Sequence, residues 1–170
     1  IGSYLSGGVD SSLIAILASE HNYENNLSFH GKFTQYPGYD ESSYAKIAAG
    51  KANTIMHEID ISAQDFSNNI SKIIYHLDYP VAGPGSFPQY MVSGLTAKHR
   101  KVVLGGQGGD EIFGGYARYL VGYLEQLIKG GLEGRLNDGS FTLSFESILP
   151  NLQVLQNYKP LLQKSWKDGL

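Results

Sequence analysis

A short segment rich in serine and glycine has the residue types that bind phosphate. It reads Ser6-Gly7-Gly8-Val9-Asp10-Ser11-Ser12 and lies between the apolar run 1–5 and a stretch of helical periodicity. Glycines let the backbone fold into a concave set of N–H donors, and a helix N-terminus adds about half a positive charge. A carboxylate beside phosphate oxygens is a usual environment of Mg²⁺, which gives Asp10 a role there. We predict a site for phosphate and a divalent cation, the alternative being a turn that only caps a helix.

A second glycine-rich segment carries an acidic pair. It follows a short β-branched run and reads Leu104-Gly105-Gly106-Gln107-Gly108-Gly109-Asp110-Glu111-Ile112-Phe113-Gly114-Gly115-Tyr116. If the two segments follow neighbouring strands, Asp110 can supply a second carboxylate to the metal that Asp10 holds. A turn with no other purpose would be costly to build from so many glycines, because glycine loses the most conformational freedom on folding.

Strand-like and helix-like stretches alternate along the chain and must position these two segments. We expect strands over 1–5, 27–33, 55–61 and 101–104, and helices over 11–20, 41–49, 63–77, 88–99 and 120–128. Asp40 and Ser62 are expected N-caps, and Gly130–Gly131 is expected to break the last helix. The alternation predicts an α/β fold with a parallel, doubly wound sheet flanked by helices. Ligands of such sheets bind beyond the carboxyl ends of the strands, where both glycine segments are expected.

Composition excludes several classes of function. The 170 residues are 42% apolar, which is enough for the core of one domain, and their net charge of −3 leaves no general basic surface for nucleic acid. The absence of cysteine excludes disulfides, thiolate zinc sites and a cysteine nucleophile in this sequence. No apolar run approaches the 18 or so residues of a membrane span, so we expect no membrane partner. The lack of cysteine fits a reducing compartment, and we expect a cytoplasmic location. Because the first residue is Ile1 rather than Met, we expect a piece of a longer polypeptide.

The two glycine segments together resemble one family. The first resembles the Ser-Gly-Gly-x-Asp-Ser signature of the N-type ATP-pyrophosphatases, the PP-loop enzymes that bind ATP, transfer AMP to an acceptor oxygen and release pyrophosphate. The second resembles the Ser-Gly-Glu-Gly-x-Asp-Glu-hydrophobic-Phe-Gly-Gly-Tyr string of asparagine synthetases. Weaker matches are Asp40-Glu41-Ser42-x-Tyr44-Ala45, His57-x-Ile59 and Asp78-x-Pro80. The chain thus resembles the synthetase domain of the asparagine synthetase family, which is also similar to β-lactam synthetase.

The resemblance implies a fold, ligands and a reaction. The fold is the ATP-pyrophosphatase (adenine nucleotide α-hydrolase-like) sheet, with residues 1–120 as its core and 121–170 as a helical extension of the same, truncated domain. ATP and Mg²⁺ are the implied cofactors, and a small, aspartate-like carboxylate is the implied substrate. ATP would activate the carboxylate to an acyl-adenylate, and ammonia from a glutaminase domain of the full-length chain would then form the amide. A homodimer is a further expectation.

Site residues are carried over from the family position by position. The implied ATP-binding residues are Leu5, Ser6, Gly7, Gly8, Asp10, Ser11, Gly31, Gly105 and Gly106. The implied magnesium ligands are Asp10 and Asp110.

Two positions depart from the family string. Gly105 and Gln107 stand where that string has Ser and Glu, and the family Glu is associated with forming the acyl-adenylate and handling ammonia. Gln107 is therefore the candidate catalytic residue, although its amide cannot ionise and so cannot take a proton. Three alternatives stay open: an ATP-binding domain of reduced or lost activity, amidation of another acceptor in polysaccharide or peptide biosynthesis, and a different ATP-pyrophosphatase, which would lack the second segment.

Overall fold

The computed structural model describes residues 1–21, 25–79 and 85–133. The chain divides into two compact units, residues 1–107 and 108–170, which are described separately below. Within the described ranges, none of the helices has the length and hydropathy that a bilayer span requires.

Four parallel strands form the centre of the first unit. They are β1 (Gly2–Tyr4), β2 (Leu27–Lys32), β3 (Ile55–Asp60) and β4 (Val103–Leu104). The unit's helices are α1 (Val9–His21), α2 (Ser42–Lys51), α3 (Ala63–Leu77) and α4 (Ser86–Ala97), with a short 3₁₀ helix, η1, over Pro37–Tyr39. The predicted α/β fold with a parallel sheet is therefore confirmed.

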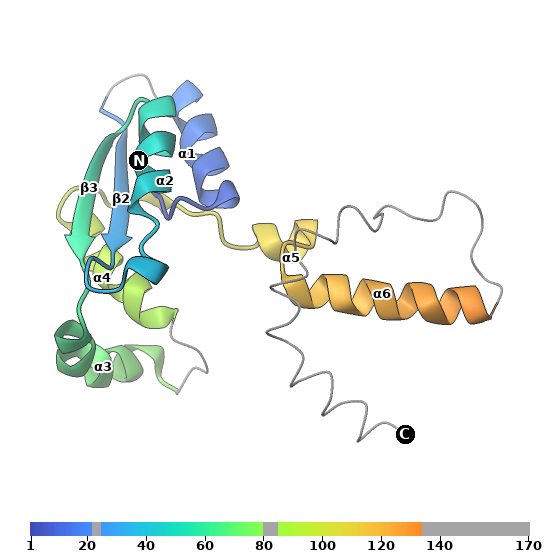
Figure 1. Cartoon of the computed structure of the whole chain (residues 1–170). Helices are drawn as coiled ribbons and strands as arrows, with labels where there is room; N and C mark the ends of the chain where they lie inside the picture. The colour runs from blue at the N-terminus through green and yellow to red at the C-terminus, as the bar shows by residue number, and fades with distance from the viewer. Residues whose placement is uncertain (22–24, 80–84, 134–170) are drawn as a thin grey trace. The chain divides into compact units, whose positions relative to one another are not determined.

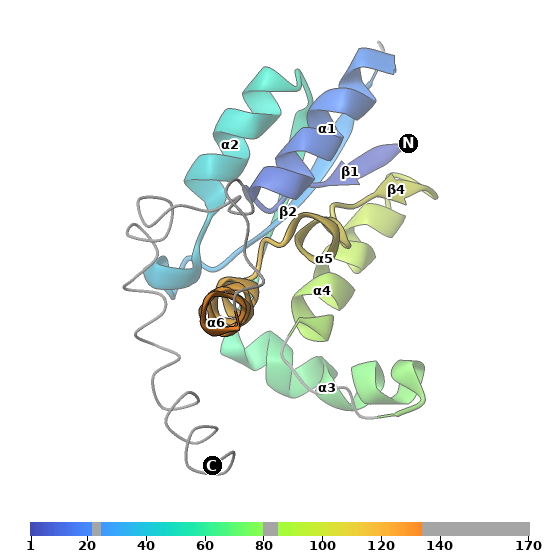
Figure 2. The same cartoon turned by 90° about the vertical axis from the view of Figure 1, so that its right-hand side faces the viewer.

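The sheet carries a hydrophobic core on each face. Helices α1 and α2 lie side by side on one face, and α4 packs on the other (Figures 1 and 2). The first core is built largely from small residues, including Ala15 and Ala45, and also contains Leu5. The second contains Ile61 and Phe87 and joins the sheet to α3 and α4. Small side chains on the buried face of α2 let that helix approach the strands closely. The start of α2 therefore lies close to the loop that follows β1.

The order of the strands places both glycine segments at one point of the sheet. The order is β3-β2-β1-β4, so the chain winds outward from β1 to β3 and then crosses to the opposite side of β1. The direction of winding therefore reverses between β1 and β4. In sheets of this kind, ligands bind beyond the carboxyl ends of the strands at such a reversal.

Capping interactions explain where two helices begin. Ser62 caps α3 as predicted, since its side chain accepts from the Asp65 N–H while the Asp65 carboxylate accepts from the Ser62 N–H. The prediction for Asp40 is wrong by one residue, because α2 begins at Ser42 and Glu41 occupies the N-cap position. The Asp40 carboxylate nevertheless accepts from the Ser42 N–H at 3.3 Å.

The second unit contains two helices over its described residues. The short helix α5 (Gly109–Phe113) lies within the second glycine segment, where only a turn was expected. Helix α6 (Ala117–Leu132) begins earlier than predicted and continues through Gly130 and Gly131, so the predicted break is wrong. Glycine in a helix interior costs only about 1 kcal/mol each, which the rest of a long helix can offset. The expected turn at Asn137–Gly139 and the rest of the tail lie outside the described residues.

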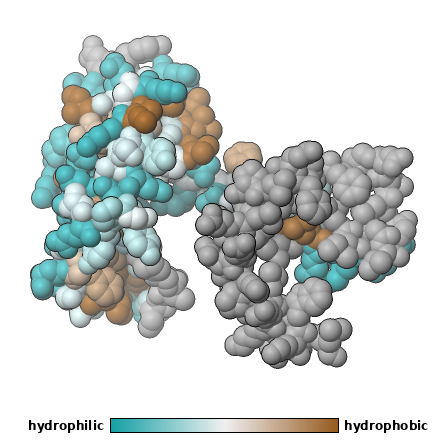
Figure 3. All heavy atoms as spheres, viewed as in Figure 1, coloured by the Kyte–Doolittle hydropathy of each residue, from teal (hydrophilic) through white to brown (hydrophobic). Residues whose placement is uncertain are grey.

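On the face shown in Figure 3, apolar side chains gather over α1. They belong to Val9, Leu13 and Leu17, which recur every four residues and are 83%, 51% and 44% exposed. Nothing among the described residues of the first unit covers this stripe.

Candidate functional site

The loop after β1 is shaped by its contact with the start of α2. Gly7 has a φ of 98°, in the left-handed region that side chains rarely adopt. A Cβ atom at Gly7 would lie 2.9 Å from the Glu41 carbonyl oxygen and 2.9 Å from the Ala45 nitrogen. Backbone atoms cannot move aside as a flexible side chain can, so this position requires glycine. The loop is thus pressed against α2 and directs the N-terminus of α1 toward the carboxyl end of the sheet.

Serine hydroxyls hold the loop together from inside. The Ser6 and Ser11 hydroxyls lie 2.9 Å apart, and the Gly8 N–H donates to the Ser6 hydroxyl at 3.2 Å. The Ser12 hydroxyl donates to the Gly8 carbonyl at 2.7 Å. The first N–H groups of α1, including that of Asp10, have no acceptor within the helix, as at any helix start. The loop therefore combines a fixed shape with the kind of donors that bind phosphate.

The second glycine segment meets this loop backbone to backbone. Strand β4 pairs with β1 in parallel, with Ser3 opposite Leu104, so both turns leave the same end of the sheet. A Cβ atom at Gly106 would lie 2.7 Å from the Ser11 nitrogen and 2.8 Å from the Asp10 carbonyl carbon. The structure thus brings together Asp10, Ser11 and Gly106, three of the predicted ATP-binding residues. Only a residue without a side chain allows the two turns to approach so closely.

Gln107 is held in place by two neighbours. Its Nε2 donates to the Gln89 side-chain oxygen at 3.2 Å. A Cβ atom at Gly105 would overlap the Gln107 Oε1, so the Gln107 side chain fills the space that a larger residue at 105 would need. The two departures from the family string are therefore spatially coupled. Gln89 lies on α4 and belongs to no recognisable motif, so it was not predictable from the sequence.

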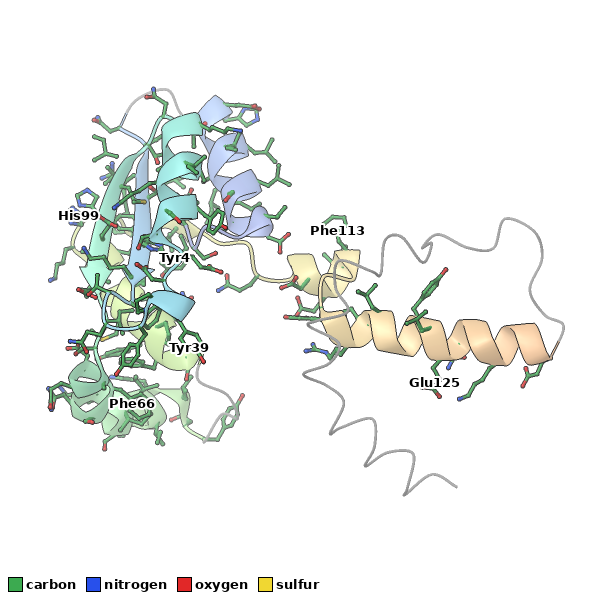
Figure 4. All side chains as sticks on the ribbon, viewed as in Figure 1. Tyr4, Tyr39, Phe66, His99, Phe113 and Glu125 are labelled. Carbon is green, nitrogen blue, oxygen red and sulfur yellow. The ribbon has the colours of Figure 1, made fainter. Side chains whose placement is uncertain are left out.

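A hollow of about 240 Å³ lies beside the loop. Leu5, Ser6 and Gly31, three more of the predicted ATP-binding residues, line it together with Tyr4 and Tyr39, which Figure 4 labels.

Close packing behind Gly31 explains why a glycine stands there. A Cβ atom at Gly31 would lie 2.8 Å from the Ile61 side chain and 2.9 Å from that of Val92. Both neighbours belong to the second core, so only glycine fits there without displacing core side chains. The hollow is lined by aromatic and aliphatic side chains with a few polar groups, as small-molecule sites usually are.

A histidine that the sequence reasoning overlooked lies under the loop. His30, on β2, is 2% exposed, and its Nδ1 lies 2.7 Å from the Leu5 carbonyl oxygen. Its Nε2 lies 3.0 Å from the Ser42 hydroxyl oxygen. That hydroxyl donates to Asp40 at 2.6 Å, and this hydrogen bond is the main cause that lowers the pKa of the Asp40 carboxyl below its ordinary value. A histidine next to Gly31, in a short strand that ends at the predicted site, is the signal that could have identified it.

The remaining predicted metal ligand belongs to the second unit. Asp110 lies in the first turn of α5, and its carbonyl accepts from the Gly115 N–H at 2.9 Å. The pairing of Asp110 with Asp10 stays a prediction. Among the residues that the structure describes, no three His, Cys, Asp or Glu side chains gather into a metal site. Magnesium is usually bound by only one or two carboxylates together with substrate phosphates, so a carboxylate such as Asp10, in a loop with the kind of donors that bind phosphate, fits that ion.

Comparison with known proteins agrees with the geometry. The family model described as asparagine synthase matches residues 1–168. The chain is 37% identical over 119 residues to glutamine-hydrolysing asparagine synthetase 1 of Bacillus subtilis, covering 70% of this chain and 18% of that protein. It is 40% identical over 120 residues to a putative asparagine synthetase of Mycobacterium tuberculosis, with coverage of 70% and 18%. It is 33% identical over 128 residues to asparagine synthetase B of Escherichia coli, with coverage of 68% and 23%.

The chain thus spans 18% to 25% of the length of the curated relatives it matches. The match to the family model runs through nearly the whole sequence and includes both glycine segments. The chain belongs to the asparagine synthase family.

Proposed function

We propose that this chain is the ATP-using part of a glutamine-hydrolysing amidotransferase of the asparagine synthetase type, a carbon–nitrogen ligase. The observation that supports this most directly is the contact of the Gly106 backbone with Asp10 and Ser11, which joins the two glycine turns into one surface. That surface lies where the winding of the sheet reverses, which is where sheets of this kind bind nucleotides.

Each part of the site has a separate task in the proposed binding of ATP. The loop N–H groups and the N-terminus of α1 hold the phosphates, while the hollow lined by Leu5 and Gly31 takes the adenosine. The serine hydroxyls fix the loop, so that little reorganisation accompanies binding. Magnesium, held by Asp10 and Asp110, would neutralise charge on the phosphates.

The proposed reaction has two steps. An oxygen of the substrate carboxylate attacks the α-phosphorus of ATP, the bond from that phosphorus to the bridging oxygen breaks, and pyrophosphate leaves. Ammonia then attacks the acyl carbon, the bond to AMP breaks, and the nitrogen loses a proton to give the amide. The chain contributes mainly positioning and charge stabilisation. The ammonia would come from glutamine in a glutaminase domain of the full-length protein, which we propose to be cytoplasmic and homodimeric.

The surroundings of Gln107 favour an acceptor other than aspartate. An ionised Glu at this position could take a proton or balance the ammonium group of an amino acid, whereas an amide can do neither. The Gln107 amide donates a hydrogen bond to the Gln89 side chain and packs over Gly105. We therefore propose a carboxylate without an ammonium group as the second candidate substrate, as in amidation during polysaccharide or peptide biosynthesis.

Exchange of labelled pyrophosphate into ATP tests this function. The exchange requires reversible formation of an acyl-adenylate, so it should depend on the added carboxylate. A panel containing aspartate, glutamate, simple acids and uronic acids separates the two candidates. Exchange with aspartate supports asparagine synthesis, and exchange with only the acids that lack an amino group supports the second candidate. If MgATP binds but no carboxylate supports exchange, the chain is an ATP-binding domain that has lost the chemistry.

A further inference from the structure

Gln107 belongs to a row of uncharged polar side chains that runs from the second glycine turn to the hollow. Its Nε2 donates to the Gln89 Oε1 at 3.2 Å, and the Gln89 Nε2 lies 3.5 Å from the Ser93 hydroxyl oxygen. The Ser93 and Tyr4 hydroxyl oxygens are 2.8 Å apart. Gln89 and Tyr4 also line the hollow, and Figure 4 labels Tyr4. This polar row therefore continues the wall of the hollow as far as the turn after β4.

Glycine at position 105 permits this placement of the Gln107 side chain. A Cβ atom at Gly105 would overlap the Gln107 Oε1, so the serine of the family string could not stand beside Gln107 in its present conformation. Gly105 thus provides the space, and Gln89 provides the hydrogen bond, that hold the Gln107 carboxamide in place. Gln89 lies 18 residues away on α4, so the arrangement depends on a residue outside the glycine segment.

The free hydrogen-bonding groups of Gln107 match a hydroxyl group. A carboxamide has two N–H donors and an oxygen that accepts, and Gln89 uses one of the donors. Among the described residues of the first unit, the second N–H and the Oε1 have no partner, and the side chain is exposed. A hydroxyl group can accept from the first and donate to the second, whereas an ammonium group only donates.

The polar row contains no charged side chain. Among the described residues that line the hollow, the one carboxylate is that of Glu41, at the N-cap of α2. Helix α2 packs on the opposite face of the sheet from α4, which carries Gln89. An ammonium group bound against Gln107 would lose water without gaining a counter-charge from this row, and that is costly for an ion. A hydroxyl group in the same place needs no counter-charge.

We propose that Gln89, acting through Gln107, determines which carboxylate is activated, and that the pair selects an acceptor with a hydroxyl group near the reacting carboxylate. Gln89 is the positioning residue, and the Gln107 carboxamide binds the hydroxyl. Malate is such an acid, since it is aspartate with a hydroxyl in place of the ammonium group. The C4 hydroxyl of a uronic acid lies the same number of bonds from its carboxylate. This inference rests on the proposed activation of a carboxylate by ATP.

The first test uses acids that share one carbon skeleton. L-Aspartate, L-malate and succinate carry an ammonium group, a hydroxyl and a hydrogen at the same carbon, and D-glucuronate is a larger hydroxy acid. Each is assayed with the full-length protein by exchange of labelled pyrophosphate into ATP. We expect the better of the two hydroxy acids to exceed both succinate and L-aspartate in kcat/KM by about two- to tenfold, the usual effect of one hydrogen bond.

The second test asks whether Gln89 and Gln107 act as a pair. Methionine has nearly the shape of glutamine without its hydrogen-bonding groups, so the variants are Gln89→Met, Gln107→Met and the double variant. Each should abolish the advantage of the hydroxy acid over succinate, and the double variant should do no more than Gln107→Met alone. A merely structural role of Gln89 would lower exchange with every acid equally and leave this ratio unchanged. The control is Gln64→Met, on an exposed turn of α3.

A measurement on the wild type keeps the inference testable if a variant does not fold. The side-chain amides of glutamine are labelled with nitrogen-15, and the hydroxy acid is added together with Mg²⁺ and α,β-methylene-ATP, which cannot release pyrophosphate. The side-chain amide signals of Gln107 and Gln89 should shift more with the hydroxy acid than with succinate, while that of Gln64 stays in place.

Different failures have different meanings. A preference of the wild type for L-aspartate or succinate over both hydroxy acids, or a ratio that Gln89→Met leaves unchanged, would overturn the inference while leaving acyl-adenylate formation intact. So would side-chain amide signals of Gln107 that respond equally to the hydroxy acid and to succinate. Absence of exchange with every carboxylate would instead overturn the proposed reaction, and the role of Gln89 with it.

Discussion

The contact between the two glycine turns makes Gly106→Ala a sensitive test of the site. The new Cβ atom would lie 2.7 Å from the Ser11 nitrogen and 2.8 Å from the Asp10 carbonyl carbon. To reach 3.4 Å, where ordinary van der Waals contact begins, the turns must separate by about 0.7 Å. Both neighbours are backbone atoms within the first turn of α1, so no side-chain rotation can relieve the overlap.

The size of the effect follows from this overlap. Inserting a methyl group into a well-packed region typically costs about 1–3 kcal/mol. If most of that cost falls on the geometry that binds nucleotide, MgATP affinity should fall about tenfold or more. Calorimetric titration of MgATP measures the affinity, and urea unfolding measures how much of the cost falls on stability.

Gly50→Ala is the matched control for this substitution. Gly50 lies near the end of α2 and has nothing within 4 Å of the position of a Cβ atom. The control should leave MgATP affinity unchanged and raise stability by about 0.5–1 kcal/mol, because alanine is the better helix former. Affinity and stability of Gly106→Ala equal to those of the wild type would refute the direct contact between the two turns.

Three further predictions test other parts of the structure. Gln107→Glu should raise aspartate-dependent pyrophosphate release severalfold if the missing carboxylate limits the reaction with aspartate, and an unchanged rate would show that the acceptor itself differs. Ser62→Ala should lower the free energy of unfolding in urea by about 1 kcal/mol through loss of the α3 cap, with Ser67→Ala on an exposed turn of α3 as its control. Hydrogen bonds from Ser42, Thr34 and Ser62 lower the pKa values of Asp40, Asp60 and Asp65 below the ordinary 3.8, so these carboxyls stabilise the fold above that value. Urea unfolding should therefore show stability falling as the pH drops below about 4, where the unfolded chain binds more protons, and Asp65→Asn should reduce that slope.

Local patterns made the order of elements and the first turn predictable. The apolar run of β1, the glycines after it and the periodicity of α1 all lie close together in sequence, and each favours the observed structure. Ser62 was predictable for the same reason, since its partner Asp65 lies only three residues away. Gly31 was named as a site residue only from the resemblance to the family, and the structure gives a packing reason for glycine there, its close approach to Ile61 and Val92.

Features that depend on distant residues were not predictable. Gln89 and Gln107 are 18 residues apart and His30 and Leu5 are 25 apart, and no periodicity joins either pair. The start of α2 was predicted one residue too early. The Asp40 carboxylate does accept from the Ser42 N–H, but the helix begins only at Ser42, so Glu41 occupies the N-cap position. The continuation of α6 through Gly130 and Gly131 was missed because glycine weakens a helix without always ending it.

The central claim is that the turns after β1 and β4 bind the same nucleotide. Manganese can replace magnesium in the complex with ATP, and its unpaired electrons broaden the NMR signals of nearby amides in the full chain. We predict that Mn²⁺ with ATP broadens the amide signals of Gly7 and Gly8 together with that of Gly106, while Gly50 stays sharp. Broadening at only one of the two turns would contradict a shared site.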